Sequence, residues 1–280
     1  MIRQSASRLF AYHTFAAILA MLLCHVVLIR SANADEAVSA QAVYTDETAS
    51  AQAAWISAIG NDRTDTLARL LDEHSPDLLL PLTATNGKTA LMVAAKLGDK
   101  AFARSLVAAG SDINSRTVTG GTAFMFAILG DDLELARWFK TLGADVHVQG
   151  TNGWTAVTIA SAKGFTETLE WLLEIGADGR VPDVYRFTPL MRAVDNNHLS
   201  AARMLIEKAQ ANVNAVDEYD NTPLHHAVSV SLETGQSDMV ELLLDAGASA
   251  LSKNREGVTP LAIASKSEAL SSLLINATPK

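Results

Sequence analysis

Cysteine is almost absent from this sequence of 280 residues. The single one, Cys24, lies inside an apolar run near the N-terminus. If that run is removed, the remaining chain has no thiol, so it can neither mispair nor gain a disulfide in an oxidising compartment. The stability of such a chain must come from the packing of its side chains.

Catalytic motifs are also missing. The sequence has no Ser/His/Asp grouping with motif context, no Cys/His spacing for a metal and no glycine-rich phosphate loop. The neighbours His225 and His226 would face different ways on a helix. We expect His226 to line a core or groove. The adjacent carboxylates at 131–132 and 217–218 fall in predicted turns, where solvated side chains are expected. The sequence therefore predicts no enzyme, no metal and no cofactor.

Long hydrophobic runs are limited to one, residues 15–29. A short basic segment precedes it, and Ala32 and Ala34 follow with the spacing that signal peptidase requires. These features predict a secretory signal peptide over residues 1–34, cleaved between Ala34 and Asp35. The alternative is an uncleaved anchor, although a spanning helix needs about 20 apolar residues and this run is shorter.

Positive charge is scarce, because 22 Lys and Arg face 31 Asp and Glu, a net charge of −9. Loss of residues 1–34 removes three arginines and leaves −12. An acidic surface repels nucleic acid and anionic lipid headgroups. We therefore expect neither nucleic acid nor, after signal cleavage, a membrane as a partner.

A repeated pattern fills most of the remaining chain. Six similar segments recur at intervals of 33, 33, 33, 34 and 37 residues, and a period of this length indicates a repeat architecture. The 37-residue interval carries about four extra residues, 231–234, which are predicted to form a loop between two helices. The six segments open with Thr89-Ala-Leu-Met, Thr122-Ala-Phe-Met, Thr155-Ala-Val-Thr, Thr188-Pro-Leu-Met, Thr222-Pro-Leu-His and Thr259-Pro-Leu-Ala.

Each repeated segment has the chemistry of a helix start. A threonine hydroxyl can accept a hydrogen bond from the first helical turn, and proline suits the next position because no N–H is needed there. A second helix follows, and most units close with a Gly-Ala-Asp type loop, in which glycine permits a left-handed helix cap. Period, helix opening and closing loop together resemble the ankyrin-repeat family over residues 52–275.

The resemblance implies an all-α solenoid of paired antiparallel helices with finger loops and about seven repeats, caps included. It also implies that His225, which occupies a position of the family's repeated helix opening, forms hydrogen bonds within and between repeats. The predicted parts are a flexible leader over 35–51, an N-terminal cap repeat over 52–83, five repeats over 84–253, a truncated C-terminal cap repeat over 254–275 and a tail over 276–280. End repeats are atypical because one of their faces meets water.

In ankyrin-like arrays the loop before each threonine projects as a finger and lines one edge of the concave surface. Aromatic residues fall on three successive fingers, although folding needs none there, and aromatic side chains on rigid scaffolds often anchor partners. Local packing of Trp154 and Phe187 onto an adjacent finger is an equal alternative for these two. The candidate partner-binding residues are Lys88, Asn152, Trp154, Tyr185, Phe187, Tyr219 and Asn221.

The expected function is that of an exported, monomeric, non-enzymatic protein that binds another protein through its concave face. A signal peptide on an ankyrin array is more typical of bacteria, which predicts the periplasm or secretion. The partner would be a periplasmic or envelope enzyme that is protected, assisted or inhibited. Two alternatives remain: an immunity protein that neutralises a toxin delivered to the periplasm, and a secreted effector that acts on host proteins.

Overall fold

The computed structural model describes residues 34–277, and these contain α-helices, turns and loops but no strand. The predicted signal peptide lies outside the described residues, apart from its last residue, Ala34. The described residues fall into two units, which divide between Ala54 and Trp55. No helix within 34–277 is both long and apolar enough to span a membrane.

Helix α2 (Ala34–Gly60) includes the segment that the sequence suggested to be a flexible leader. The helix has a simple local cause: alanine is frequent between residues 34 and 59, and this stretch contains neither glycine nor proline. Its last residues belong to the second unit, where Trp55 and Ile59 are completely buried. With α3 (Thr64–Glu73), they form the predicted N-terminal cap repeat. The short helix α4 (Pro76–Leu79) follows.

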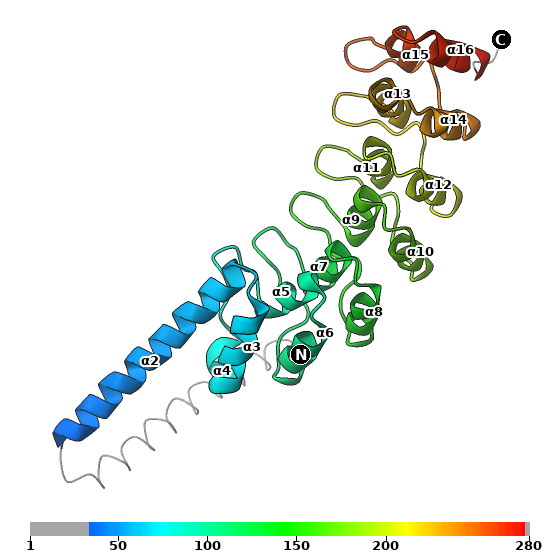
Figure 1. Ribbon diagram of the computed structural model, residues 1–280. Helices are drawn as coiled ribbons and strands as arrows, with labels where there is room; N and C mark the ends of the chain where they lie inside the picture. Colours follow the sequence, from blue (N-terminus) through cyan, green and yellow to red (C-terminus); the bar gives the residue numbers. More distant parts are fainter. Residues whose placement is uncertain (1–33, 278–280) are drawn as a thin grey trace, which may run out of the picture. The chain divides into compact units, whose positions relative to one another are not determined.

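Six further helix pairs follow in the second unit, so the described residues hold seven pairs in all (Figure 1). The first helices of these pairs, here called the first row, are α5 (Ala90–Leu97), α7 (Ala123–Leu129), α9 (Ala156–Lys163), α11 (Pro189–Asp195), α13 (Pro223–Thr234) and α15 (Pro260–Ala264). The second row comprises α6 (Lys100–Ala108), α8 (Leu133–Thr141), α10 (Thr166–Glu174), α12 (Leu199–Glu207), α14 (Asp238–Asp245) and α16 (Glu268–Ala277). The last helix therefore extends into the predicted tail.

The six repeated threonines all occupy the position immediately before a first-row helix, as predicted. Thr89, for example, accepts a hydrogen bond from the backbone N–H of Met92 at 3.3 Å, and Thr259 accepts one from Ala262 at 3.1 Å. Such bonds satisfy N–H groups that have no partner inside the helix. The period of the sequence is thus the period of the helix starts.

Packing between successive repeats buries the first row. Helix α5 contacts α7, and the same contact continues through α9, α11, α13 and α15. Six of the eight residues of α5 are buried, and in the second row Leu106, Leu169 and Leu172 are completely buried. Because short helices are unstable alone, this stacking between neighbours supplies most of the stability of the array.

Left-handed backbone conformations recur at three positions per repeat: the fourth finger residue, the turn between the two helices, and the end of the second helix. Most of these positions are glycine, but six are not: Asp62, Asp131, Arg186, Asn197, Gln210 and Asp220. Gln210, with φ 52°, takes the place of the glycine missing after α12. That repeat closes like the others, although its sequence does not show it.

The extra residues 231–234 form helix rather than the predicted loop. They lengthen α13 to 12 residues, whereas α11 has 7, and the helix ends at Gly235 with φ 77°. Ser231 is buried, so the added turn begins on the packed side of the helix. An insertion of about four residues can continue a helix because it adds close to one full turn.

Candidate functional site

The fingers form one hydrogen-bonded row. In each finger the N–H of the first residue donates to the carbonyl of the fifth at 2.9–3.0 Å, and the N–H of the second donates to the third residue of the preceding finger at 2.8–3.2 Å. These bonds connect all six fingers and fix their backbones against one another. The fingers are residues 84–88, 117–121, 150–154, 183–187, 217–221 and 254–258, and together with the first-row helices they are called the finger face.

Two buried carboxylates hold the fourth and fifth fingers from inside. Asp183 accepts the N–H groups of Tyr185 and Phe187 at 2.9 and 3.0 Å, and Asp217 accepts those of Tyr219 and Asn221 at 2.8 Å each. Their side chains are 0% and 3% exposed. The expectation that the 217–218 carboxylates are solvated is therefore wrong for Asp217, because the finger turns around this side chain and covers it.

Tyr185 and Tyr219 occupy the third position of these two fingers. Their exposed fractions are 54% and 58%, and Val184, which precedes Tyr185, is exposed to 59%. Large side chains are usually more buried than this in a folded chain. The structure therefore presents two tyrosines on neighbouring fingers whose backbones are fixed.

Trp154 and Phe187, by contrast, pack within the finger face. The guanidinium carbon of Arg192 lies 5.1 Å from the Trp154 ring centroid and 4.4 Å from that of Phe187. Arg192 also forms an ion pair with the buried Asp183. The two aromatic rings and the guanidinium are thus neighbours through cation–π contacts, which matches the local-packing alternative for these residues.

The three polar candidates also have partners within the protein. Lys88 is buried, and its ammonium group lies 2.7 Å from Asp62. Asn221 donates to Asp217 at 3.2 Å and accepts from the side chain of Asn254 at 2.8 Å. Asn152 is exposed, but its side-chain oxygen accepts the N–H of Trp154 at 3.1 Å. The structure thus gives these residues a role in holding the fingers.

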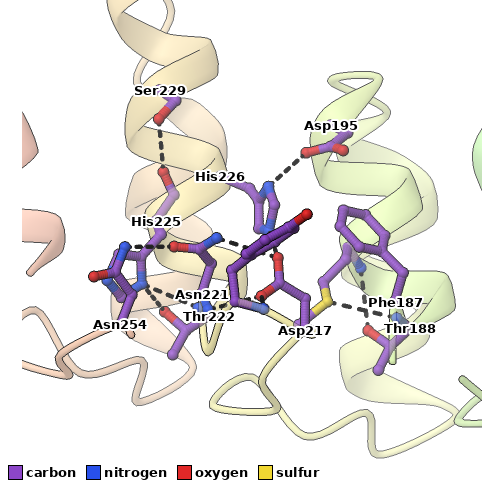
Figure 2. A network of polar contacts seen from close by, with 12 residues as sticks. Phe187, Thr188, Asp195, Asp217, Asn221, Thr222, His225, His226, Ser229 and Asn254 are labelled. Atoms are coloured by element: carbon purple, nitrogen blue, oxygen red, sulfur yellow. Dashed lines mark hydrogen bonds and ion pairs between the residues drawn. The ribbon is translucent and has the colours of Figure 1, made fainter. Parts of the chain in front are cut away.

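His225 is hydrogen-bonded within and between repeats, as predicted (Figure 2). Its Nδ1 accepts the N–H of Thr222 at 3.0 Å, so the proton of the neutral ring is on Nε2. Nε2 donates to the carbonyl of Val258 in the next finger at 3.1 Å. Burial is the main cause that lowers the pKa of His225, and the ring is therefore neutral.

His226 lies between two carboxylates from different elements. Its Nδ1 is 3.0 Å from Asp195 of α11, and its Nε2 is 3.1 Å from Asp217 (Figure 2). The ring of Phe187 packs edge-on against it, with 4.9 Å between centroids. His226 therefore lines the finger face, which agrees with the groove alternative, and it connects the fourth and fifth fingers to the helices behind them.

Arg192 and Asp195 are site residues that the sequence did not single out. Both lie on α11, between the finger of Tyr185 and the finger of Tyr219. The period offered a partial signal, because Asp183 and Asp217 both stand first in their fingers. Nothing local, however, associates Arg192 with Trp154, which is 38 residues earlier in the chain.

Within residues 34–277, no group of three or more His, Cys, Asp or Glu residues could hold a metal ion.

Comparison with known proteins agrees with this geometry. The family described as "Ankyrin repeats (3 copies)" matches residues 55–148 and 124–217, and "Ankyrin repeat" matches 219–255. The human 2-5A-dependent ribonuclease is 41% identical over 76 residues, which are 27% of this chain and 10% of that protein. This chain thus spans about a tenth of the length of that curated relative.

A similar fold is found in the crystal structure of the human ASB11 ankyrin repeat domain. The TM-score is 0.66, with 24% sequence identity over 81% of this chain and 98% of the other. The likeness concerns the fold, and the family matches cover most of the sequence. The regular helix pairs, the linked fingers and these matches together show that the chain belongs to the ankyrin-repeat family.

Proposed function

We propose that this ankyrin-repeat chain, a protein–protein interaction module, binds its partner protein through the finger face, with Tyr185 and Tyr219 as the anchors. Ankyrin repeats generally form non-catalytic scaffolds for interaction. The observation that carries the proposal is the exposure of these two rings on adjacent fingers that are fixed by Asp183 and Asp217.

Rigid, exposed aromatic residues make efficient anchors. Little conformational freedom is lost when a partner binds, because the finger backbones are already ordered by the inter-finger hydrogen bonds. Tyrosine offers a large apolar ring and a hydroxyl group that can form a hydrogen bond, and it is enriched among residues that dominate binding energy. Trp154 and Phe187 already pack against Arg192, so we assign the anchor role to the two tyrosines.

The partner belongs to the compartment in which the chain resides, and we propose the periplasm. The support is the sequence pattern of residues 1–34, with its basic start, apolar run and Ala32/Ala34 spacing. There the chain would hold, protect or inhibit an envelope enzyme. N-terminal sequencing of protein recovered from the cell envelope tests export: a chain that begins at Asp35 supports it, and a full-length membrane-embedded chain contradicts it.

The binding test is an affinity capture from periplasmic extract with the mature chain, followed by titration of the captured protein against variants. Tyr185→Ala and Tyr219→Ala should each weaken binding by about 1–2 kcal/mol, as truncation of an anchor does. The matched control is Leu142→Ala, because Leu142 is an exposed apolar residue, 42% accessible, at the end of α8 in the second row. If both tyrosine variants bind like the wild type, the finger face is not the interface.

A further inference from the structure

The contacts of His226 favour a doubly protonated ring. Each of its two nitrogens lies 3.0–3.1 Å from a carboxylate oxygen, Nδ1 from Asp195 and Nε2 from Asp217. A neutral imidazole has one N–H and one lone pair, so it can donate to only one of these carboxylates. Only the imidazolium ion, with a hydrogen on both nitrogens, satisfies both contacts.

This contact joins three elements around the proposed anchors. Asp195 is the last residue of α11, the helix that follows the finger of Tyr185. Asp217 begins the finger of Tyr219 and accepts its N–H at 2.8 Å. His226, on α13, bonds to both and also packs against Phe187 of the preceding finger. Protonated His226 therefore bridges the two tyrosine-bearing repeats.

We propose that His226 is a proton-controlled clamp that holds Asp217, and with it the finger of Tyr219, against Asp195 of α11 while it is protonated and releases this finger when the proton leaves. The binding consequence rests on the function proposed above: the Tyr219 anchor is preorganised, and the chain binds a partner more tightly, below the pH at which His226 titrates. On loss of the proton one nitrogen lone pair faces a carboxylate oxygen, so one hydrogen bond is lost and replaced by repulsion.

The other titratable or charged groups near His226 are neutral or already paired, so the two carboxylates control its protonation. On its own helix, His225 is neutral because burial lowers its pKa. On α11, Arg192 packs on Phe187, and its charge is paired with Asp183. Burial by itself would lower the pKa of His226, but hydrogen bonds and charge from Asp195 and Asp217 outweigh it and raise this pKa above the ordinary value of 6.5. The transition is therefore expected above the ordinary histidine pKa.

The test uses the mature chain and NMR titration of the His226 ring between about pH 5.5 and 9, a range that brackets the ordinary histidine pKa. Hydrogen-exchange protection factors of the Tyr219 and Asn221 N–H groups, both bound by Asp217, are measured in parallel. We expect His226 to titrate above 6.5 with both nitrogens protonated below the transition, and the protection of both amides to fall with the same midpoint.

Three variants make the interpretation specific. Asp195→Asn removes one carboxylate at the rim and should move both the His226 titration and the loss of protection to lower pH. Asp238→Asn changes the same charge on α14 and should leave both unchanged. His226→Gln, which cannot titrate, should give protection factors that do not follow this transition. The clamp would be overturned by a His226 pKa at or below 6.5, or by amide protection factors that do not change as His226 titrates.

Failure of the clamp and failure of the interface give different results. If His226 does not titrate as expected but the tyrosine variants lose binding, the interface stands and the clamp is wrong. If His226 controls finger protection but the tyrosine variants bind normally, the clamp stands and its proposed effect on partner binding is wrong. If both succeed, the captured partner should bind more weakly to wild type above the transition and show no such change with His226→Gln.

Discussion

Arg186 and Asp220 occupy the same position in neighbouring fingers, and both have left-handed backbones, with φ of 62° and 61°. The corresponding residue in the other four fingers is glycine. The Arg186 guanidinium lies 3.3 Å from the Asp220 carboxylate, so the two strained residues form an ion pair with each other. The pair sits beside Tyr185 and Tyr219 and places charged groups next to the proposed anchors.

Replacement of Arg186 by glycine should relieve backbone strain. A left-handed residue with a Cβ costs about 1–2 kcal/mol, whereas glycine adopts this conformation freely but loses more entropy on folding. The ion pair is exposed and contributes little. We expect Arg186→Gly to be about 1 kcal/mol more stable than Arg186→Ala, which loses the same ion pair but keeps the strain. Urea denaturation of the two variants measures this difference, and equal stabilities would contradict it.

Replacement of Asp62 by asparagine should loosen the N-terminal cap repeat. The Asp62 carboxylate lies 2.7 Å from the ammonium group of the buried Lys88 and 2.9 Å from the ammonium group of Lys96. Asparagine tolerates the left-handed backbone at this position. Loss of these charged hydrogen bonds should lower the free energy of unfolding by roughly 1–3 kcal/mol at neutral pH. Chemical denaturation measures it, and Asp65→Asn on α3 is the control.

The difference in stability between wild type and Asp62→Asn should depend on pH. Burial would raise the pKa of Asp62, but hydrogen bonds and charge from Lys88 and Lys96 lower it below the ordinary 3.8. The stabilisation is therefore fully present above pH 3.8 and lost as pH falls through the lowered pKa. The stability difference between wild type and Asp62→Asn should shrink in acid. A difference that grows in acid would show that the lysine contacts do not set this pKa.

Replacement of Arg192 by methionine should leave the buried Asp183 carboxylate without its cation. Breaking one side of a buried ion pair costs up to about 3–5 kcal/mol, and Asp183 is 0% exposed. The double variant Asp183→Asn/Arg192→Met should recover part of this loss, because no charge is then buried alone while the amide oxygen can still accept the finger N–H groups. A double variant less stable than Arg192→Met would exclude this explanation.

Replacement of buried leucines should depend on the place of the repeat in the array. Leu172 in α10 and Leu274 in α16 are both completely buried. Leu172→Ala should cost about 2–5 kcal/mol as a large-to-small core change. Leu274→Ala should cost less in a global unfolding experiment, because the last described repeat has one described neighbour and can open without the rest. Equal losses would argue against a linear array.

Helix starts were predictable because their determinants are local. A threonine before Ala or Pro satisfies the N–H groups of the turn that follows it, whatever the rest of the chain does, so the period of the sequence became the period of the repeats. The inter-repeat bond of His225 was predictable for a similar reason, since its position in the repeated segment is fixed. The insertion 231–234 was misjudged, because it continues helix α13. Residues 35–51 are also helical, and their composition permits it.

The neighbours of the finger aromatics depend on the tertiary structure. Trp154 and Phe187 stand fifth in their fingers, and Tyr185 and Tyr219 stand third, but nothing in the sequence indicates that Arg192 reaches the first two rings from α11. The burial of Asp217 and the position of His226 between two carboxylates likewise depend on the spacing between neighbouring repeats. The starts of helices and fingers follow from the sequence alone, because those signals act within a few residues. Contacts between side chains more than 30 residues apart arise from stacking, and stacking determined which residues support the finger face and which remain exposed.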